Sequence, residues 1–410
     1  MKFLGAAILL LSTLSFADGW VKAEGDHFTV NGTRLAFLSA NMWYGATLGA
    51  LDKPRLRREL DSLHRLGVRN VRIMAASEGP DSEPWRVSPS LQPSPGIYNE
   101  NIFTGLDFFL DEMSKRHMYA VLCLGNFWHW SGGFSQYVAW NGDGPIPYPL
   151  RKESGDWEQY KRYAESFYTN LGAKADYLRF VRKTVSRVNS ITGVSYLSDP
   201  TIMTWELANE PTTDKQETLE AYAEWIRSTA RMIKQMDPNH LVISGSEEPY
   251  FKEINGLKDI DYATIHVWAQ NSGWYNPKKP LRTYPASLRN AHEKLKMYSD
   301  VMQVLHKPLV VAEIGLARDL GSYSVESSTT FRDHYYNDVM TRALMLNVAG
   351  VAFWAWSGEG RPPVEGGRWQ VSDPLLGDPA HEPQGWYGVY DVDASTLKTI
   401  REFSDRWHLN

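Results

Sequence analysis

The sequence predicts a (β/α)8 (TIM) barrel, and three observations lead to this fold class. From residue 35 onward, short apolar runs alternate with longer segments of helical periodicity, which is typical of βα units around a parallel sheet. Eight of the apolar runs are candidate strands, and eight is the number of strands in this barrel. Two long segments follow strands and precede helices, at the end where barrel enzymes carry their active sites.

The elements are expected in a simple order along the chain. His27–Phe37, with Asn31-Gly32 at its centre, is expected to form a β-hairpin ahead of the barrel and to cover its bottom. The eight candidate strands are Leu35–Asn41, Val68–Met74, Ala120–Asn126, Thr201–Asn209, Leu241–Gly245, Tyr262–His266, Leu309–Glu313 and Val351–Trp356. The helical patterns between them are Lys53–Leu66, Gly105–Arg116, Ala173–Ile191, Asp214–Met236, Tyr284–Leu305 and Phe331–Leu346.

Long βα loops interrupt the alternation of strands and helices. Ser77–Asn101 is rich in Pro and Ser, and Trp128–Asn170 is rich in Gly, Trp and Tyr. A third long stretch, Gly358–Tyr390, follows the eighth strand. Since no linker, internal repeat or second-domain boundary is visible, residues 18–410 are expected to form a single catalytic domain.

Residues 1–17 have the pattern of a signal peptide. Lys2 precedes the apolar stretch Phe3–Leu14, and Ser15-Phe16-Ala17 forms a small-residue cleavage site. No later segment has the roughly 18 uninterrupted apolar residues of a membrane span. The mature chain is therefore expected to be secreted, to either the periplasm or the medium, without a membrane association. The single cysteine, Cys123, lies in an apolar run and is expected to be buried and inert.

The composition narrows the classes of function. The chain of 410 residues has 43 Lys and Arg against 48 Asp and Glu, a formal charge of −5, which excludes nucleic-acid binding by bulk charge. With 43% hydrophobic and 22% charged residues, the chain is globular. The 16 Trp and 21 Tyr can fill the core or present flat faces to ligands.

Two strands deliver carboxylates to their C-terminal ends. Glu210 closes the run at Thr201–Asn209, and Pro211 is expected to hold Glu210 in an extended conformation. Glu313 closes the seventh strand. Because the fourth and seventh strands of a closed barrel face each other across its mouth, both carboxylates can reach one ligand. Glycoside hydrolysis needs such a pair, one as proton donor and the other as nucleophile or base.

Other catalytic patterns are absent from the sequence. There is no HExxH or CxxC metal-ligand spacing, no Gly-rich phosphate loop after a strand and no Gly-x-Ser-x-Gly elbow. No metal and no cofactor are therefore expected. Glu206, which lies on the same strand as Glu210 but deeper, is expected to pair with an interior cation or polar group.

The sequence resembles glycoside hydrolase family 5 and, within it, the β-1,4-mannanases. Asn209-Glu210-Pro211 and Glu313 match the clan of retaining (β/α)8 glycosidases. The resemblance covers residues 20–408, and the further matching motifs are Val71-Arg72-Ile73, Asn126-Phe127-Trp128, Gly132-Gly133, Tyr137-Val138-Ala139-Trp140, Arg187–Gly193, Ile265-His266-Val267-Trp268 and Ala352-Phe353-Trp354.

The resemblance implies a role for each matched position. Glu210 would be the acid/base, Glu313 the nucleophile, and Asn209 a hydrogen-bond donor to the sugar 2-hydroxyl. Arg72 would keep Glu313 ionised, and His266 would bond near the acid/base. Trp354 would floor the subsite that holds the sugar at the cleaved bond, and Trp128 would line a neighbouring subsite. The implied substrate-binding residues are Arg72, Asn126, Trp128, Asn209, His266, Trp268, Trp274 and Trp354.

Two positions depart from the family pattern. Thr212 and Thr213 stand where relatives carry an Arg that helps to bind sugar on the leaving-group side, which puts affinity on that side in doubt. Trp268 stands where many relatives carry a Tyr that donates a hydrogen bond to the nucleophile. An indole N–H can replace the phenol as a donor but not as an acceptor.

The resemblance implies a secreted, retaining, monomeric endo-β-1,4-mannanase that acts on mannan, glucomannan or galactomannan and on manno-oligosaccharides. Three alternatives stay open: an exo-acting mannanase or transglycosylase, a β-glucanase of the same family, and a non-catalytic polysaccharide-binding barrel. Exo action would need a loop that blocks one end of the cleft, and Trp128–Asn170 is the candidate.

Overall fold

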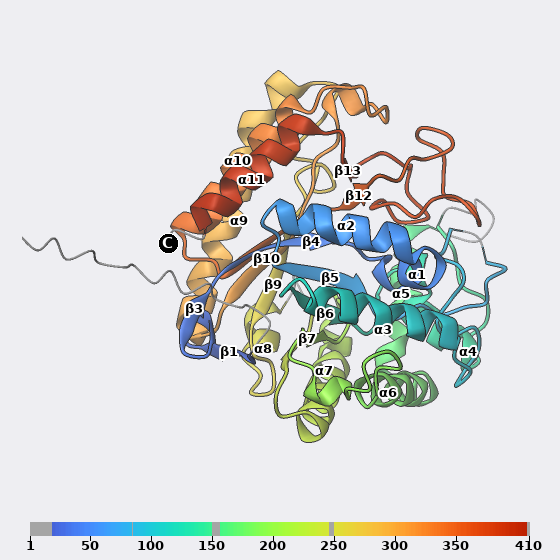
Figure 1. The fold of residues 1–410 in the computed structure, drawn as a ribbon. Coiled ribbons are helices and arrows are strands. Elements are labelled where there is room, and N and C mark those ends of the chain that lie inside the picture. The colour runs from blue at the N-terminus through green and yellow to red at the C-terminus, as the bar shows by residue number, and fades with distance from the viewer. Residues whose placement is uncertain (1–18, 84, 150–155, 246–249, 408–410) are drawn as a thin grey trace, which may run out of the picture.

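A computed structural model describes residues 19–83, 85–149, 156–245 and 250–407 (Figure 1). The signal peptide predicted for residues 1–17 lies outside the described residues. In the described part of the chain, no helix combines the length and the apolar character needed to cross a membrane.

Eight parallel strands form the central sheet, which confirms the predicted fold class. Their order is β8-β7-β6-β5-β4-β11-β10-β9. The bounds are β4 (Phe37–Asn41), β5 (Asn70–Met74), β6 (Tyr119–Cys123), β7 (Ile202–Glu206), β8 (Leu241–Ile243), β9 (Ala263–Val267), β10 (Leu309–Ile314) and β11 (Gly350–Phe353). Asp261 links the two edge strands, because its backbone N–H donates to Val242 O at 2.9 Å and its carboxylate accepts from Val242 N at 2.6 Å. The sheet is therefore a nearly closed barrel.

Helices surround this sheet (Figure 1). They are α1 (Gly45–Leu51), α2 (Lys53–Arg65), α3 (Glu100–Ser114), α6 (Leu171–Val185), α7 (Gln216–Met236), α8 (Phe251–Asn255), α9 (Pro280–Leu305), α10 (Thr330–Met345) and α11 (Ala394–Trp407). Side-chain caps start several of them: Asp52 accepts from Arg55 N, Asn99 from Asn101 N and Asn170 from Ala173 N. All six predicted helices are present, but α6 ends at Val185 because the next residues turn back, pairing Val188 with Ser195.

The bottom of the barrel is covered by a small antiparallel sheet of β1 (Val21–Glu24), β2 (His27–Val30) and β3 (Thr33–Leu35). Asn31 and Gly32 both have positive φ, +51° and +76°, so the predicted hairpin turn is present. The apolar residues of this sheet pack against the bottom of the barrel in a cluster that includes Val21, Phe28, Val30, Leu35, Tyr119, Met203, Leu241, Tyr262 and Val310. This packing confirms the predicted cover and leaves the other end of the barrel for a site.

The three long loops lie at that other end. The segment after β6 folds into α4 (Gly133–Trp140) and α5 (Trp157–Glu165), and the segment after β11 carries the short strands β12 (Trp356–Gly358) and β13 (Val389–Tyr390). Figure 1 shows the orange-red loop between β12 and β13 at the same end of the barrel as α4 and α5. Cys123 is buried, as predicted.

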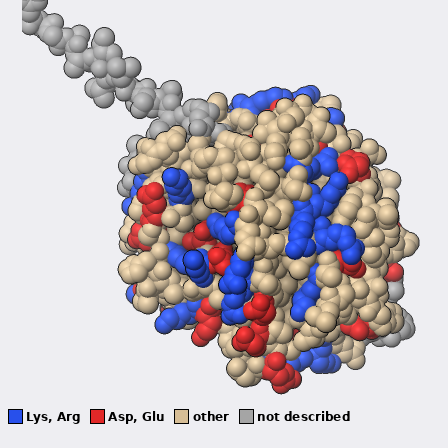
Figure 2. Space-filling model, turned by 90° about the horizontal axis from the view of Figure 1, so that it is seen from below, with Lys and Arg blue, Asp and Glu red and all other residues tan. Residues whose placement is uncertain are grey.

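One side of the molecule, seen in Figure 2, carries Lys and Arg interspersed with Asp and Glu. Among the described residues, several surface charges are paired, for example Arg58 with Glu359 at 2.5 Å and Arg116 with Asp61 at 2.7 Å. On this face both signs of charge occur, and the largest group of Lys and Arg side chains lies right of the centre in Figure 2.

Candidate active site

Glu210 and Glu313 meet in the mouth of the barrel. Glu210 follows β7, Glu313 lies in β10, and His266 of β9 lies with them. One carboxylate oxygen of each Glu and a ring nitrogen of His266 all lie within 4.8 Å of one another. The topology thus brings together the two carboxylates that the sequence places on opposite strands.

The backbone at Glu210 differs from the prediction. Its φ is +50°, in the left-handed region, whereas Pro211 was expected to keep it extended. The surrounding loop imposes this conformation: the hydroxyl of Tyr222 donates to Pro211 O at 2.9 Å, and that of Tyr168 donates to Thr212 O at 3.0 Å. Strained backbone of this kind costs about 1–3 kcal/mol and is common at functional sites.

Both carboxylate oxygens of Glu210 have partners. His266 Nδ1 lies 2.6 Å from Oε1, and the indole N–H of Trp128 donates to Oε2 at 2.5 Å. Trp128 is itself oriented by Asn126, whose Oδ1 accepts from the Trp128 backbone N–H at 3.0 Å. The structure therefore places Trp128 against the predicted acid/base, where its indole N–H can act directly on the carboxyl group.

Glu313 is held by three side chains. Arg72 Nη1 donates to Oε1 at 2.8 Å, and the indole N–H of Trp268 donates to Oε2 at 2.9 Å. His266 Nδ1 lies 3.2 Å from the same Oε2. Trp268 thus supplies the donor that a phenol supplies in the family pattern.

Arg72 organises the floor of the site. It forms two hydrogen bonds with Glu206, at 2.6 and 2.7 Å, which is the strong two-point geometry of an Arg–carboxylate pair. It also donates to Asn41 Oδ1 at 3.1 Å and to Asn209 Oδ1 at 2.8 Å. Glu206 is therefore a partner of an interior cation, as predicted.

Asn209 is oriented from both ends of its amide. Its oxygen accepts from Arg72, and its nitrogen donates to Asn126 Oδ1 at 3.1 Å. Asn126 in turn donates to Ser131 Oγ at 3.0 Å. These bonds tie the ends of β5, β6 and β7 together and fix Asn209 beside the carboxylates.

The two carboxyl groups titrate in opposite directions. Burial raises the pKa of Glu313 to about 7 and the charge of Glu210 adds to this rise, while His266 and Arg72 oppose it. Burial would also raise the pKa of Glu210, but the interactions with His266 and Trp128 outweigh it, so this pKa lies below its ordinary value. Near neutral pH the pair can therefore hold one proton.

Aromatic rings line one side of the carboxylates. The Trp354 ring, just after β11, lies 6.0 Å from that of Trp268, and the Tyr387 ring lies 4.8 Å from that of Trp268. The Tyr387 hydroxyl donates to Asn271 Oδ1 at 2.7 Å. Trp274 is half-buried in the loop after β9, and among the described residues it makes no hydrogen bond or ring contact with the other predicted site residues.

The loops that follow β6 and β11 meet above the barrel. The ring of His129, after β6, lies 5.2 Å from that of His381, which belongs to the loop after β11. Trp157 of α5 lies 6.4 Å from His381. Because β4 and β5 lie between β6 and β11 in the sheet, this contact bridges one side of the mouth. We call His129, Trp157 and His381 the aromatic bridge.

Sequence reasoning missed Tyr387, His381 and Glu382, which all come from the loop between β12 and β13. That loop has no apolar periodicity, and its residues reach the site only through the tertiary structure. The spread of aromatic residues through the third long stretch was the one available signal.

The chain was compared with known families and proteins. Residues 18–409 match the family model described as GH family 5 beta-mannosidase-like. Among curated proteins, mannan endo-1,4-beta-mannosidase 5 of Solanum lycopersicum is 30% identical over 363 residues, covering 82% of this chain and 81% of that protein. Mannan endo-1,4-beta-mannosidase 4 of Oryza sativa subsp. japonica is 29% identical and covers 86% of this chain and 74% of that protein.

Two solved structures from one fungus differ in their likeness to this chain. The glycoside hydrolase family 5 mannosidase of Rhizomucor miehei has a TM-score of 0.89 and 35% identity, with 96% of this chain and 98% of that chain covered. The endo-1,4-beta-mannanase of the same fungus has a TM-score of 0.71 and 22% identity, with 96% and 100% covered, and supports the fold alone. A mutant of that mannosidase was solved in complex with mannosyl-fructose.

Proposed function

Because the chain belongs to the glycoside hydrolase family 5 beta-mannosidase-like family and is a glycoside hydrolase, we propose that it cleaves β-1,4-mannosidic bonds with retention of configuration. Its substrates are mannan, glucomannan or galactomannan and their oligosaccharides. The observation that carries the proposal is the convergence of Glu210 and Glu313, with carboxylate oxygens within 4.8 Å of each other. Retaining glycosidases have carboxyl groups about 5 Å apart, whereas inverting enzymes leave a wider gap for water.

The reaction takes place in two displacements. Glu313 attacks the anomeric carbon, the glycosidic C–O bond breaks, and the leaving oxygen takes the proton of Glu210. Glu210, now ionised, then removes a proton from water, which attacks the anomeric carbon and releases Glu313. Asn209 donates to the sugar 2-hydroxyl, and Trp354 supports the sugar ring.

The proton has to be on Glu210 when the bond breaks. In the free enzyme the pKa directions favour a proton on Glu313. Arg72 and Trp268 both donate to Glu313 and so stabilise its charged form when the proton leaves. His266 Nδ1, at 2.6 and 3.2 Å from the two carboxyl groups, is placed to relay the proton to Glu210 on substrate binding.

Endo cleavage is the first candidate mode, because the curated relatives carry that name. Cleavage at a chain end is the second candidate, and the aromatic bridge favours it. The bridge joins the loop after β6 to the loop after β11 and so spans the mouth on the side of β4 and β5. A wall on that side would stop a polysaccharide from continuing past the mouth, which is what cleavage at a chain end needs. The 35% identity to the fungal mannosidase supports the same candidate.

Product analysis distinguishes endo cleavage from cleavage at a chain end. Purified protein is incubated with linear mannan, glucomannan, galactomannan and carboxymethylcellulose, and reducing ends and product sizes are followed. A ladder of manno-oligosaccharides supports endo cleavage, whereas a single small product supports cleavage at the chain end. Activity on carboxymethylcellulose alone would contradict the proposed substrate, and sugar binding without any reducing-end release would support a binding protein.

The stereochemistry tests the mechanism separately. Proton NMR during the first turnovers should show the β-anomer before mutarotation, because two inversions restore the configuration. An α-anomer at early times would contradict the double displacement while leaving the substrate class intact.

We also propose that the protein is exported and monomeric. The pattern of residues 1–17 supports export with cleavage after Ala17. Mass spectrometry of the protein from the culture medium or periplasm should give a chain that starts at Asp18, and light scattering should give the mass of one chain. Retention of the full-length chain in the cytoplasm would contradict export, and a dimer mass would contradict the monomer.

A further inference from the structure

The turn at Gly132-Gly133 matches the family pattern, but the mechanism above gives it no role. Both residues have positive φ, +93° and +62°, a conformation that glycine adopts at little cost. There is also no space for a side chain. A Cβ on Gly132 would lie 2.3 Å from the carbonyl oxygen of Glu78, and a Cβ on Gly133 would lie 2.3 Å from that of Asn126. The turn therefore lies in close contact with both the loop after β5 and the end of β6.

Glu78 holds this turn from the loop after β5. Its side chain is buried, and its Oε2 accepts from the backbone N–H of Gly133 at 2.8 Å. The backbone N–H of Glu78 donates to Ser131 O at 2.7 Å. Two bonds from one residue thus fix both ends of the segment 131–133.

The loop after β5 in turn keeps Glu78 in place. Arg86 Nη1 donates to Glu78 O at 3.1 Å, and Arg86 Nη2 donates to Gln136 Oε1 of α4 at 2.7 Å. The backbone N–H of Gly79 donates to Gln92 O at 2.8 Å. Glu78 therefore belongs to a buried polar network that joins its loop to α4.

The fixed turn orients Asn126 and, through it, the acid/base. Ser131 Oγ accepts from Asn126 Nδ2 at 3.0 Å, and the backbone N–H of Phe134 donates to Asn126 O at 2.8 Å. Asn126 Oδ1 then accepts from the backbone N–H of Trp128 at 3.0 Å. The indole N–H of Trp128 donates to Glu210 at 2.5 Å. A chain of hydrogen bonds therefore leads from the loop after β5 to the acid/base.

The bond from Gly133 does not depend on a negative charge on Glu78. Burial raises the pKa of Glu78 to about 7, while the Gly133 N–H, the Tyr137 hydroxyl and Arg86 oppose this rise. At about pH 6 the carboxyl group therefore carries its proton in most molecules. A glutamine has the same shape and keeps an oxygen acceptor, so Glu78→Gln preserves the bond from Gly133.

We propose that Glu78 is a positioning residue for the acid/base Glu210. It holds the Gly132-Gly133 turn, and the turn fixes the indole N–H of Trp128 that donates to Glu210. The inference rests on the proposed cleavage of β-mannosides, and the chemistry stays with Glu210 and Glu313. Loss of Glu78 should therefore weaken proton donation to the leaving group more than it weakens attack by the nucleophile.

Two substrates that differ only in their leaving group test this role. A phenyl β-glycoside needs a proton on the leaving oxygen, whereas a 2,4-dinitrophenyl β-glycoside releases a stable anion. The glycosyl group is mannosyl if cleavage occurs at a chain end and mannotriosyl if it is endo. Glu78→Ala at about pH 6 should lower kcat/KM about 10- to 100-fold on the phenyl substrate but less than about 3-fold on the dinitrophenyl substrate. Glu78→Gln should stay within about 3-fold of wild type on both substrates.

Two further variants protect this result. Glu112→Ala removes a buried carboxylate of α3 that pairs with Arg57, Lys115 and Arg116. It should lower the melting temperature but leave kcat/KM on both substrates unchanged per folded molecule. Ser131→Ala removes the acceptor of Asn126 Nδ2 and should reduce the rate on the phenyl substrate about 3- to 10-fold relative to the other. It keeps the test decisive if Glu78→Ala does not fold.

Four outcomes would overturn the inference. Equal losses on the two substrates in Glu78→Ala or Ser131→Ala are what a merely destabilised protein would show. The same selective loss in Glu112→Ala would show that any loss of stability weakens proton donation. A loss in Glu78→Gln as large as in Glu78→Ala would show that the bond from Gly133 is not responsible. A wild-type chain that cleaves no β-mannoside would overturn the proposed function first, and this inference with it.

Discussion

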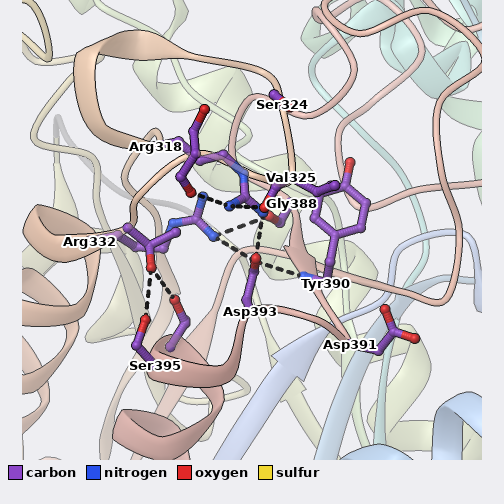
Figure 3. Close-up of polar contacts among 12 residues, drawn as sticks. Arg318, Ser324, Val325, Arg332, Gly388, Tyr390, Asp391, Asp393 and Ser395 are labelled. Carbon is purple, nitrogen blue, oxygen red and sulfur yellow. Dashed lines mark hydrogen bonds and ion pairs between the residues drawn. The ribbon is translucent and has the colours of Figure 1, made fainter.

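The buried arginine–carboxylate clusters in the described part of the chain include one in the mouth of the barrel and one at the start of α10 and α11. In the mouth, Arg72 pairs with Glu206 and Glu313 at 2.6 and 2.8 Å. In the second cluster, Arg318 and Arg332 both pair with Asp393, at 2.6 and 3.2 Å (Figure 3). Both clusters consist of arginines and carboxylates, but in the mouth one Arg pairs with two Glu, whereas in the second cluster two Arg pair with one Asp.

This reversal separates a reactive cluster from a structural one. In the mouth, burial raises the pKa of Glu313 to about 7 and the charge of Glu210 adds to this rise, so a proton becomes available. In the second cluster, further N–H groups of Arg318 and Arg332 donate to the backbone oxygens of Ser327, Leu316 and Gly388 at 3.1 to 3.2 Å. Arginine holds its proton throughout the ordinary pH range, so this cluster can fix loops but cannot exchange protons.

The largest expected effect is on catalysis in the mouth. Glu313→Gln keeps the shape of the side chain but removes the nucleophile, so kcat should fall by at least about 10⁴-fold. The free energy of unfolding should not fall, because Arg72 keeps its two bonds to Glu206. Steady-state kinetics and urea unfolding check both statements, and residual activity above about one percent would contradict the assignment of the nucleophile.

Azide distinguishes the two carboxylates. Glu210→Ala leaves space for a small anion, which can attack the glycosyl-enzyme formed from a substrate with an activated leaving group. We expect azide to restore part of the activity of Glu210→Ala and none in Glu313→Gln. Equal loss without rescue in both variants would argue against the separate roles.

A substitution in the second cluster should reduce stability and leave activity unchanged. Asp393→Ala leaves Arg318 and Arg332 buried without their shared counter-ion, so the free energy of unfolding should fall by about 3–5 kcal/mol. Activity per folded molecule at 25 °C should be unchanged. Asp391→Ala is the matched control, because it removes a partly exposed partner of Arg361 and should cost at most about 1 kcal/mol. Equal destabilisation by both variants would contradict the importance of burial.

The free energy of unfolding, measured over a series of pH values, tests the raised pKa of Glu313. Burial raises the pKa of Glu313 to about 7 from an ordinary value of 4.5, so the folded protein keeps a proton that the unfolded chain loses between these values. The contribution of Glu313 to stability therefore decreases as the pH rises from 4.5 to 7. Relative to wild type, Glu313→Gln should gain about 1–3 kcal/mol between pH 4.5 and pH 8, as measured by urea unfolding. A constant difference would contradict the raised pKa.

The smallest effect concerns a single donor to the nucleophile. Trp268→Phe removes the N–H that reaches Glu313 Oε2 at 2.9 Å, and kcat/KM should fall about 10-fold. Trp268→Tyr offers a hydroxyl donor instead and should recover part of this loss. If Trp268→Phe and Trp268→Tyr behave alike, packing and not hydrogen bonding determines the role of this position.

The sequence predicts the regular part of the molecule well because apolar periodicity dictates it. All eight barrel strands and six helices are found near their predicted positions, and Glu210, Glu313 and Arg72 meet as expected. Helix α4 was missed because six of its eight residues, Gly133–Val138, are buried, so no polar face marks it. The backbone of Glu210 and the contact of His381 with His129 depend on tertiary structure, which local patterns do not contain.

The position of α11 has a consequence for when the active site can be completed during synthesis. Ser404 of α11 donates to Gly67 O at 3.2 Å, and Arg401 donates to Arg65 O, so α11 packs beside the segment that leads into β5. Barrel strands β10 and β11, which complete the sheet beside β4, also come late. At roughly 5–20 residues per second, a ribosome needs about 5–20 s for the roughly 100 residues between Glu206 and Glu313. During that time the nascent chain carries Arg72 and Glu206 but not the nucleophile, so activity can begin only when synthesis has nearly finished.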